Sequence, residues 1–347
     1  MKKILALLII PFFSANAQIG GNSIFQFLNL VPSARVAAQG SNAIANPEED
    51  INFAIYNPSL LNESMHGQLS FSLVDYVAGI NLSDVNYAHH FEDVGTFYAG
   101  LRYVDYGDFE RASIIGIREG TFTAADMALN FGYAYKLDSN WSFGASLKVI
   151  NSNYETFNSY GSAMDLAATY QIPSKRIVMA LVAKNMGYQF SPFNEERESL
   201  PFEIQFGFSN RFEHLPLRWQ ITLEQLETWD LRYRDPADVS VNQFTGEVDD
   251  NFPSVWSNIF RHVVVGAEFA PTKALNVQFG YNFRKRQELN LDTRRTSAGF
   301  SFGLGIKISK FRLNYGRNFY HVSGTANHFT LRTDLQDFKR KKKEPKT

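Results

Sequence analysis

The chain has 347 residues and a formal net charge of −1, so its charge gives no indication of a nucleic-acid partner. It contains no cysteine, which excludes disulfides, thiol catalysis, cysteine-based zinc sites and lipid attachment through an N-terminal cysteine. After the first 17 positions no stretch of about 18 apolar residues occurs, so the sequence offers no transmembrane helix.

The first seventeen residues have the three parts of a secretory signal peptide. A basic start (Lys2-Lys3) precedes an apolar run from Ile4 to Phe13, and Ala15-Asn16-Ala17 forms a small-residue cleavage site. The alternative is a short buried helix, but the three parts stand in the order that export requires. We therefore expect residues 1–17 to be a signal peptide and Gln18 to begin the mature chain.

Residues 18–66 show no strand pattern and are punctuated by Gly, Pro and Asn. One short helix is predicted within Val31 to Ala38, starting near Ser33. The segment also contains apolar residues, which argue against the alternative of a disordered periplasmic leader: Ile24, Phe25, Phe27, Leu28, Leu30 and Val31. A barrel of fourteen strands encloses more space than its own side chains fill. We therefore expect residues 18–66 to form an N-terminal plug inside the barrel predicted below.

From residue 67 onward apolar and polar residues alternate, which gives each predicted strand one apolar face and one polar face. Most of these segments have about 11–15 residues, whereas a strand of a soluble domain averages about 5–6 and a tilted membrane-spanning strand needs about 9–11. The fourteen segments are 67–77, 80–91, 95–106, 121–136, 139–152, 160–172, 176–187, 201–213, 215–227, 260–271, 273–285, 295–309, 311–321 and 326–335. They predict an all-β fold, a closed antiparallel 14-stranded transmembrane β-barrel over residues 67–335, because closure leaves no unpaired strand edge.

The connections between these segments alternate in length. Transmembrane barrels have short periplasmic turns and longer outer loops. If the first strand runs outward, only the hairpin near Ala78-Gly79 is a short outer turn, and the longer connections all fall on the outer side: 107–120, 153–159, 188–200, 228–259, 286–294 and 322–325. The pattern therefore favours the outer membrane as the location.

Side-chain types along the strands predict which face meets lipid. Aromatic residues near strand ends are expected to form interfacial girdles: Tyr106, Tyr135, Trp141, Tyr170, Trp219, Tyr281 and Tyr320. The alternative is that they form the core of a secreted β-sandwich. Polar strand residues are expected to face the lumen, since Arg or Lys facing lipid costs about 2–4 kcal/mol at the midplane: Arg102, Lys148, Asp165, Gln205, Gln220, Glu224, Gln278 and Arg312.

The sequence shows no assembled set of catalytic or metal-binding residues. It has no H-E-x-x-H, P-loop, G-x-S-x-G or S-x-x-K motif. His89 and His90 are adjacent on one strand, so their side chains point to opposite faces and cannot hold one metal together. Asp249-Asp250 alone is a weak signal for a cation. We expect no enzyme activity, no cofactor and no metal. The basic tail 336–347 is expected to be solvated in the periplasm, with contact to an anionic surface or a partner as the alternative.

The longest outer loop, 228–259, carries an unusual density of large apolar side chains for a segment in water. Such groups usually mark an interface or fold over the barrel mouth, and Trp and Tyr are frequent binding anchors. The residues predicted to bind a partner are Trp229, Tyr233, Phe252 and Trp256.

A resemblance to a known family lies within residues 20–65. The run from Ser33 to Ala43, Glu49-Asp50 and the element Asn57-Pro58-Ser59-Leu60-Leu61 resemble the N-terminal hatch of the PorV/PorQ barrels, which have the long-chain fatty-acid transporter-like fold of fourteen strands. Gln18 to Gly21 and Phe25-x-Phe27-Leu28 are closer to the PorQ branch. Asn57, Pro58 and Leu60 match the family's plug motif, which has alanine where this chain has Ser59.

The resemblance implies a component of the type IX secretion system of Bacteroidetes. Such a barrel sits among outer-membrane lipids and anchors a surface-exposed, PorZ-like secretion protein of the cargo-attachment complex, with PorU and PorV homologues as possible further partners. The shared fold leaves a transporter of a hydrophobic small molecule as the alternative. Across all the strands the residues on the predicted inner face are mainly Ser, Gly, Asn and Gln, which argues against an apolar substrate path. A third possibility, an enzyme on a barrel platform, lacks catalytic residues.

Overall fold

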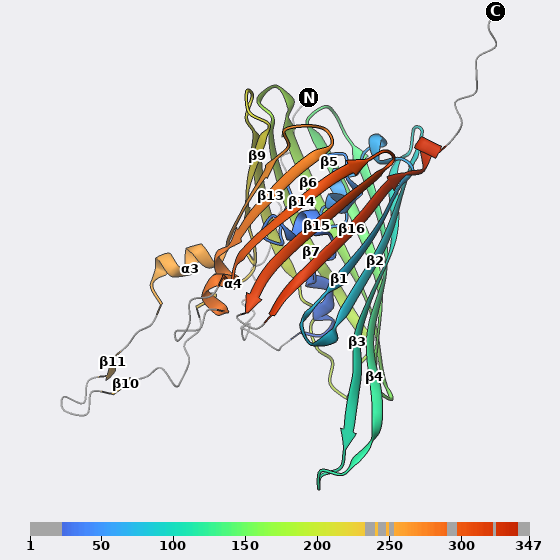
Figure 1. The fold of residues 1–347 in the computed structure, drawn as a ribbon, viewed down its shortest axis with the longest axis vertical. Helices are drawn as coiled ribbons and strands as arrows, with labels where there is room; N and C mark the ends of the chain where they lie inside the picture. Colours follow the sequence, from blue (N-terminus) through green and yellow to red (C-terminus); the bar gives the residue numbers. More distant parts are fainter. Residues whose placement is uncertain are drawn as a thin grey trace, which may run out of the picture.

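The computed structural model describes residues 23–232, 240–241, 248–249, 253–289, 297–321 and 324–338. Fourteen antiparallel strands within these residues close into a barrel in the order β1-β16-β15-β14-β13-β12-β9-β8-β7-β6-β5-β4-β3-β2 (Figure 1). Each predicted segment overlaps one of these strands, which confirms the closed antiparallel barrel. The predicted signal peptide, Gln18 and residues 339–347 of the basic tail lie outside the described residues.

The wall strands differ greatly in length. Their bounds are β1 Gln68–Asp75, β2 Asn81–Phe91, β3 Gly95–Ala112, β4 Arg118–Lys136, β5 Trp141–Tyr154, β6 Phe157–Ile172, β7 Ile177–Ser191, β8 Glu203–Arg211, β9 Leu217–Leu223, β12 Val263–Phe269, β13 Leu275–Asn282, β14 Phe300–Ile308, β15 Phe311–His321 and β16 Gly324–Asp334. The longest strands are β3 and β4, and they project beyond the others at the end that carries the predicted outer loops (Figure 1).

The strand faces are reversed relative to those of a water-soluble protein. On β5, Phe143, Leu147 and Val149 are exposed on the outside, while Ser146 and Lys148 are buried on the inside. An apolar exterior around a polar interior is the arrangement of a membrane-spanning barrel. No helix among the described residues is long and apolar enough to cross a membrane.

The inward orientation of the predicted lumen residues is confirmed. All are buried except Arg312, which is half-buried: Arg102, Lys148, Asp165, Gln205, Gln220, Glu224 and Gln278. Two of the predicted girdle aromatics point inward instead. Tyr106 donates a hydrogen bond to buried Asp126 (2.6 Å), and Tyr320 packs against Tyr76 with ring centroids 6.0 Å apart. Side chains along a strand alternate between its two faces. Tyr106 lies four positions after inward-facing Arg102, and Tyr320 lies two positions after inward-facing Asn318, so both tyrosines share the inner face.

Several predicted outer loops are shorter in the structure than in the sequence analysis. Residues 107–120 are mostly strand, since β3 continues to Ala112 and β4 starts at Arg118, and only residues 155–156 separate β5 from β6. The predicted strand 273–285 ends at Asn282, whose side chain accepts a hydrogen bond from Lys285 N (2.9 Å) and caps the helix α4, Phe283–Glu288. Strands β3 and β4 therefore continue beyond their predicted boundaries, and the Asn282 cap ends β13 before its predicted boundary.

The outer loop 228–259 is partly folded. It contains the short strands β10 Ser240–Val241 and β11 Val248–Asp249, which pair with each other, and most of helix α3, Val255–Arg261. Asp250 lies outside the described residues, as do Tyr233 and Phe252.

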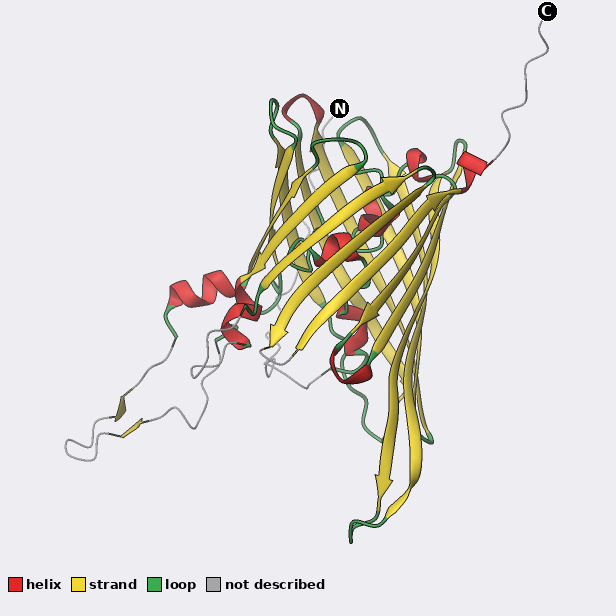
Figure 2. Cartoon of the chain, in the orientation of Figure 1, coloured by secondary structure: helices red, strands yellow, loops and turns green. Residues whose placement is uncertain are grey.

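The described part of the N-terminal segment, residues 23–66, lies inside the barrel (Figure 2). It forms short helical turns: η1 Gln26–Asn29, α1 Ala34–Ala37, α2 Ile51–Ala54, η2 Pro58–Leu60 and η3 Glu63–Met65. The predicted helix near Ser33 is confirmed as α1, with the Ser33 side chain accepting from Val36 N. Three further 3-10 turns, η4 Val77–Gly79, η5 Pro173–Lys175 and η7 Leu335–Phe338, lie at strand ends.

Candidate functional site

The candidate site has two parts, the contact between the N-terminal segment and the barrel wall, and the outer surface near α3. At the first, Arg35 of α1 is almost fully buried and lies between two carboxylates. Its Nη1 donates to Asp50 Oδ2 (3.0 Å), and its Nε donates to Glu268 Oε2 on β12 (3.2 Å). Its guanidinium also lies 4.9 Å from the ring centre of Phe53. A buried guanidinium requires such partners, because an unpaired buried charge is strongly destabilising.

The network continues from Asp50 to a second wall strand. Asp50 is paired with Arg332 on β16 (3.3 Å), and its side chain caps α2 by accepting from Asn52 N (3.1 Å). Burial alone would raise the pKa of Asp50, but Arg332 and Arg35 outweigh it and hold this pKa at about 2. The carboxylate therefore stays ionised at neutral pH and ties the segment to two strands of the wall.

A second anchor lies at Asn57. Its side-chain amide donates to Ile44 O (2.7 Å) and to Thr169 Oγ1 on β6 (3.0 Å), and its Oδ1 accepts from Ser59 N (3.0 Å). Pro58 is the first residue of η2, where its missing N–H costs nothing. Leu60 is buried in an apolar cluster that includes Val178 of β7. The three residues predicted as the plug motif thus hold the segment against one part of the wall.

Glycines in the wall leave room for the segment. A Cβ at Gly280 of β13 would lie 1.9 Å from Gly40 N, and one at Gly144 of β5 would lie 2.3 Å from Ser59 N. A Cβ at Gly316 of β15 would lie 2.4 Å from Ala34 O. Backbone atoms cannot move aside as a flexible side chain can, so these strands are shaped to admit the segment.

A cavity of about 290 Å³ lies between η1 and the outer half of the wall. Arg102 borders it and donates through Nη1 to Leu28 O (3.1 Å) and Leu30 O (3.2 Å). Its lining includes seven charged side chains, which are Arg102, Lys148, Lys184, Glu203, Glu224, Arg284 and Lys285. Sites for apolar ligands are usually lined mainly by apolar side chains. This cavity therefore suits water or a polar solute better than a hydrocarbon.

The second part of the site carries Trp229 and Trp256, which are 65% and 71% exposed. Trp229 stacks on His262 at 5.6 Å, and its carbonyl accepts from Asn258 Nδ2 (2.6 Å). Asn258 Oδ1 in turn accepts from Leu231 N (2.8 Å). Trp256 lies on α3 itself, and Trp229 lies on a stretch of chain that is hydrogen-bonded to Asn258 of the same helix. Tyr233 and Phe252, predicted with them, lie outside the described residues.

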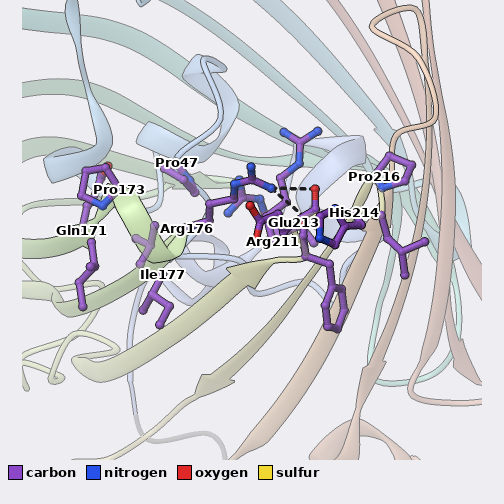
Figure 3. Close-up of a pocket in the computed structure, with 14 residues that line it drawn as sticks. Pro47, Gln171, Pro173, Arg176, Ile177, Arg211, Glu213, His214 and Pro216 are labelled. Carbon is purple, nitrogen blue, oxygen red and sulfur yellow. Dashed lines mark hydrogen bonds between the residues drawn. The ribbon is translucent and has the colours of Figure 1, made fainter.

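A pocket of about 590 Å³, separate from both parts of the candidate site, lies at the end of the barrel that carries the short turns (Figure 3). Arg176 in the turn before β7 donates to Phe212 O (3.1 Å) and Glu213 O (3.0 Å). Arg211 and Arg218 reach Glu48 of the N-terminal segment at 3.9 and 3.5 Å. Each of these arginines has at least one acidic or carbonyl partner, but Arg218 Nε and Nη1 are buried without a hydrogen-bond partner. The pocket lies between the N-terminal segment and the turns.

Sequence reasoning missed Arg35, Asp50 and Glu268 as a linked group. Arg35 and Asp50 appeared only within the family-like run, and nothing local to the sequence connects them with Glu268. Within the described residues, no group of three or more His, Asp or Glu side chains could hold a metal ion.

No protein-family model matches the chain, and no curated protein matches it. Solved structures do. The Pseudomonas putida toluene transporter TodX matches with a TM-score of 0.50 and 14% identity, over 86% of this chain and 96% of that one. A Pseudomonas aeruginosa FadL homologue matches with a TM-score of 0.47 and 10% identity, over 88% and 98%.

This chain has the fold of the TodX barrel. The predicted closed antiparallel barrel of fourteen strands is thereby confirmed, and with its apolar exterior the chain is an outer-membrane barrel. The likeness to long-chain fatty-acid transporters stays a prediction. At 14% identity the likeness concerns the fold alone. The finer assignment to the PorV/PorQ family and to Bacteroidetes stays a prediction.

Proposed function

We propose that this protein is a plugged outer-membrane barrel that anchors a surface-exposed protein of a secretion system, and that it does not conduct substrates. One observation carries the part of the proposal that concerns conduction: the N-terminal segment is fixed inside the barrel by buried charge pairs and by close backbone contacts with wall glycines. A segment that opened often would expose Arg35 and Asp50 without their partners, which is costly.

The outer surface supports the same proposal. Trp229 and Trp256 are exposed, and the backbone at Trp229 is hydrogen-bonded to Asn258 of α3, the helix that carries Trp256. Side chains carried by such a hydrogen-bonded backbone lose less entropy when a partner binds than those of an unstructured loop. The resemblance of residues 20–65 to PorV/PorQ barrels points to a PorZ-like partner in type IX secretion, with PorU and PorV homologues as further candidates.

The second candidate is a transporter of a hydrophobic small molecule. The comparisons favour it more than they favour secretion, because the barrel of similar fold is described as a toluene transporter. The charged lining of the internal cavity speaks against it in this chain.

Deleting the gene in the source bacterium separates the two candidates. If the protein is an anchor, the deletion should release one surface protein from the cells into the medium, and expression of the full chain should return that protein to the cell surface. Uptake of toluene should be unchanged. A transporter predicts slower toluene uptake and an unchanged set of surface proteins.

A further inference from the structure

The outer ends of β3 and β4 form a ribbon that stands away from the barrel (Figure 1). β2 pairs with β3 only as far as Asp105, and β5 pairs with β4 only as far as Ala124. Beyond these positions β3 and β4 pair with each other from Asp108↔Thr123 to Ala112↔Arg118. At the base of this ribbon the β4 edge is still attached to the barrel, because Glu155 N donates to Thr123 O (3.0 Å).

Both edges of this ribbon lack a neighbouring strand in the described part of the chain, over residues 108–112 and 118–122. An unpaired edge offers a row of backbone N–H and C=O groups to another strand, and natural proteins usually cover or shorten such edges. On one face Phe109 stacks on Phe122 at 5.3 Å, which stiffens the ribbon. It is therefore a preformed template for strand pairing.

The tip of the ribbon is apolar. Ile114, Ile115 and Ile117 are 107%, 79% and 59% exposed. The turn does not need their side chains, since it is closed by Gly116 N donating to Ser113 O (2.8 Å), by Ser113 N donating to Ile117 O (2.8 Å) and by Gly116 at φ +81°. Turns are normally built from Gly, Pro, Asn, Asp and Ser. Three exposed isoleucines at a turn indicate a surface that another molecule covers.

Lipid acyl chains cannot be that molecule. The outermost large residue on the lipid-facing side of β3 is Tyr103, and charged Asp105, Asp108 and Glu110 follow it. Ile114 lies nine positions beyond Asp105. At about 3.3 Å per residue the tip lies roughly 30 Å beyond Asp105 when measured along the strand, and somewhat less along the membrane normal because barrel strands are tilted. A charged stretch therefore separates the apolar tip from the membrane.

A second copy of this chain is a poor occupant as well. Two tips of three isoleucines each, with ribbons five residues long at the free edges, would bury far less than the roughly 1,200–2,000 Å² of a stable interface. A larger protein that lays a strand along an edge and covers the tip can reach that area. Such strand addition derives affinity from main-chain hydrogen bonds and specificity from side-chain pockets.

We propose that the β3–β4 ribbon docks a β-strand of the surface-exposed partner protein, which pairs along residues 108–112 or 118–122 and covers the isoleucine tip. The inference rests on the proposed anchoring function and names a docking element separate from the tryptophan surface beside α3.

The test uses the full-length tagged chain in its own outer membrane. A triple variant, Ile114→Ser with Ile115→Ser and Ile117→Ser, should lower recovery of the co-purifying surface protein by at least tenfold. The matched control is Val94→Ser, an exposed apolar residue in the turn at the opposite end, which should change nothing. Heat-modifiable migration shows that each barrel is folded.

Two further measurements identify the contact. Because the chain has no cysteine, Ile115→Cys gives a unique site for a thiol cross-linker, and it should link to the same surface protein that the wild type recovers. In the purified complex, amide hydrogen exchange along one free edge should slow by at least tenfold relative to the free barrel.

The outcomes separate the two proposals. If the wild type recovers no stoichiometric surface protein, the anchoring function fails. If the wild type recovers it, but the serine variant recovers it equally well and both edges keep their exchange rates, the ribbon proposal fails alone. A cross-link from position 115 to a second copy of this chain, with no link to the partner, also overturns the ribbon proposal.

Discussion

Arg35 and Glu268 form a buried ion pair although 233 positions separate them in the sequence, with Arg35 Nε 3.2 Å from Glu268 Oε2. The pair joins the N-terminal segment to β12, and Asp50 with Arg332 joins the same segment to β16. The strands β13, β14 and β15 lie between these two attachment points in the barrel. The segment is therefore held to a broad arc of the wall, and the predictions below follow from this attachment.

Replacing Gly280 by Ala should loosen the segment without breaking the barrel. The new Cβ would lie 1.9 Å from Gly40 N, so the segment must shift away from β13. We expect single-channel conductance in planar bilayers to rise at least tenfold over that of the wild type. Gly100→Ala is the matched control, because the three atoms nearest to its Cβ, on Asn86 and Val85, belong to the wall and not to the segment. Equal conductance of the Gly280 variant and the wild type would show that the segment does not control passage.

Removing one member of the buried pair should cost more than removing both. Arg35→Met leaves Glu268 buried without its cation, a loss of about 3–5 kcal/mol in docking of the segment. Glu268→Gln combined with Arg35→Met removes that unpaired charge and should recover part of the loss. Protease cleavage within residues 23–66 measures docking, and we expect the order of protection to be wild type, then double variant, then Arg35→Met. A double variant as sensitive as Arg35→Met would argue against direct coupling of the two charges.

Acid should release the segment only at very low pH. Asp50 has a pKa of about 2 in the folded protein, against about 3.9 for a free Asp. Its ionised form therefore stabilises docking above about pH 4, by an amount on the order of 2–3 kcal/mol that is lost as the pH falls through 2. Conductance should stay low from pH 7 to about pH 4 and rise toward pH 2. In Asp50→Asn this dependence should be weaker, and a rise near pH 6 in the wild type would contradict the assignment.

Truncating both exposed tryptophans should weaken the partner complex. Trp229→Ala with Trp256→Ala leaves every strand of the wall intact, so the barrel should insert normally. Binding of the surface protein should fall by at least about tenfold, or about 1.4 kcal/mol. Trp141→Ala serves as the control, because Trp141 is exposed at the opposite end of the barrel. Full recovery of the partner by the double variant would leave the β3–β4 ribbon as the main contact.

The sequence predicted the barrel well because alternation is a local property. Residues 141–149 alone show which side of β5 faces lipid, and the structure agrees at each of them. Alternation could not show that β3 continues to Ala112, because a register shift between Asp105 and Asp108 interrupts the pattern there. It also could not show the end of β13, which depends on the Asn282 cap.

The candidate site was predicted only in part, for a related physical reason. Trp229 and Trp256 stood out by residue type, and Asn57 by its motif. The contacts that fix the segment depend on pairs far apart in the chain, such as Arg35 with Glu268 and Gly40 with Gly280. A glycine in a strand indicates a close backbone approach, but a single sequence does not identify the approaching backbone.

The most direct test of the anchoring function is native mass spectrometry of the full chain extracted from its own outer membrane in mild detergent. An anchor should appear as the intact barrel bound to one surface-exposed protein, with no stoichiometric apolar small molecule, and the complex should survive at neutral pH. A barrel that appears alone, carrying one apolar ligand per chain, would contradict the account and make the protein a transporter.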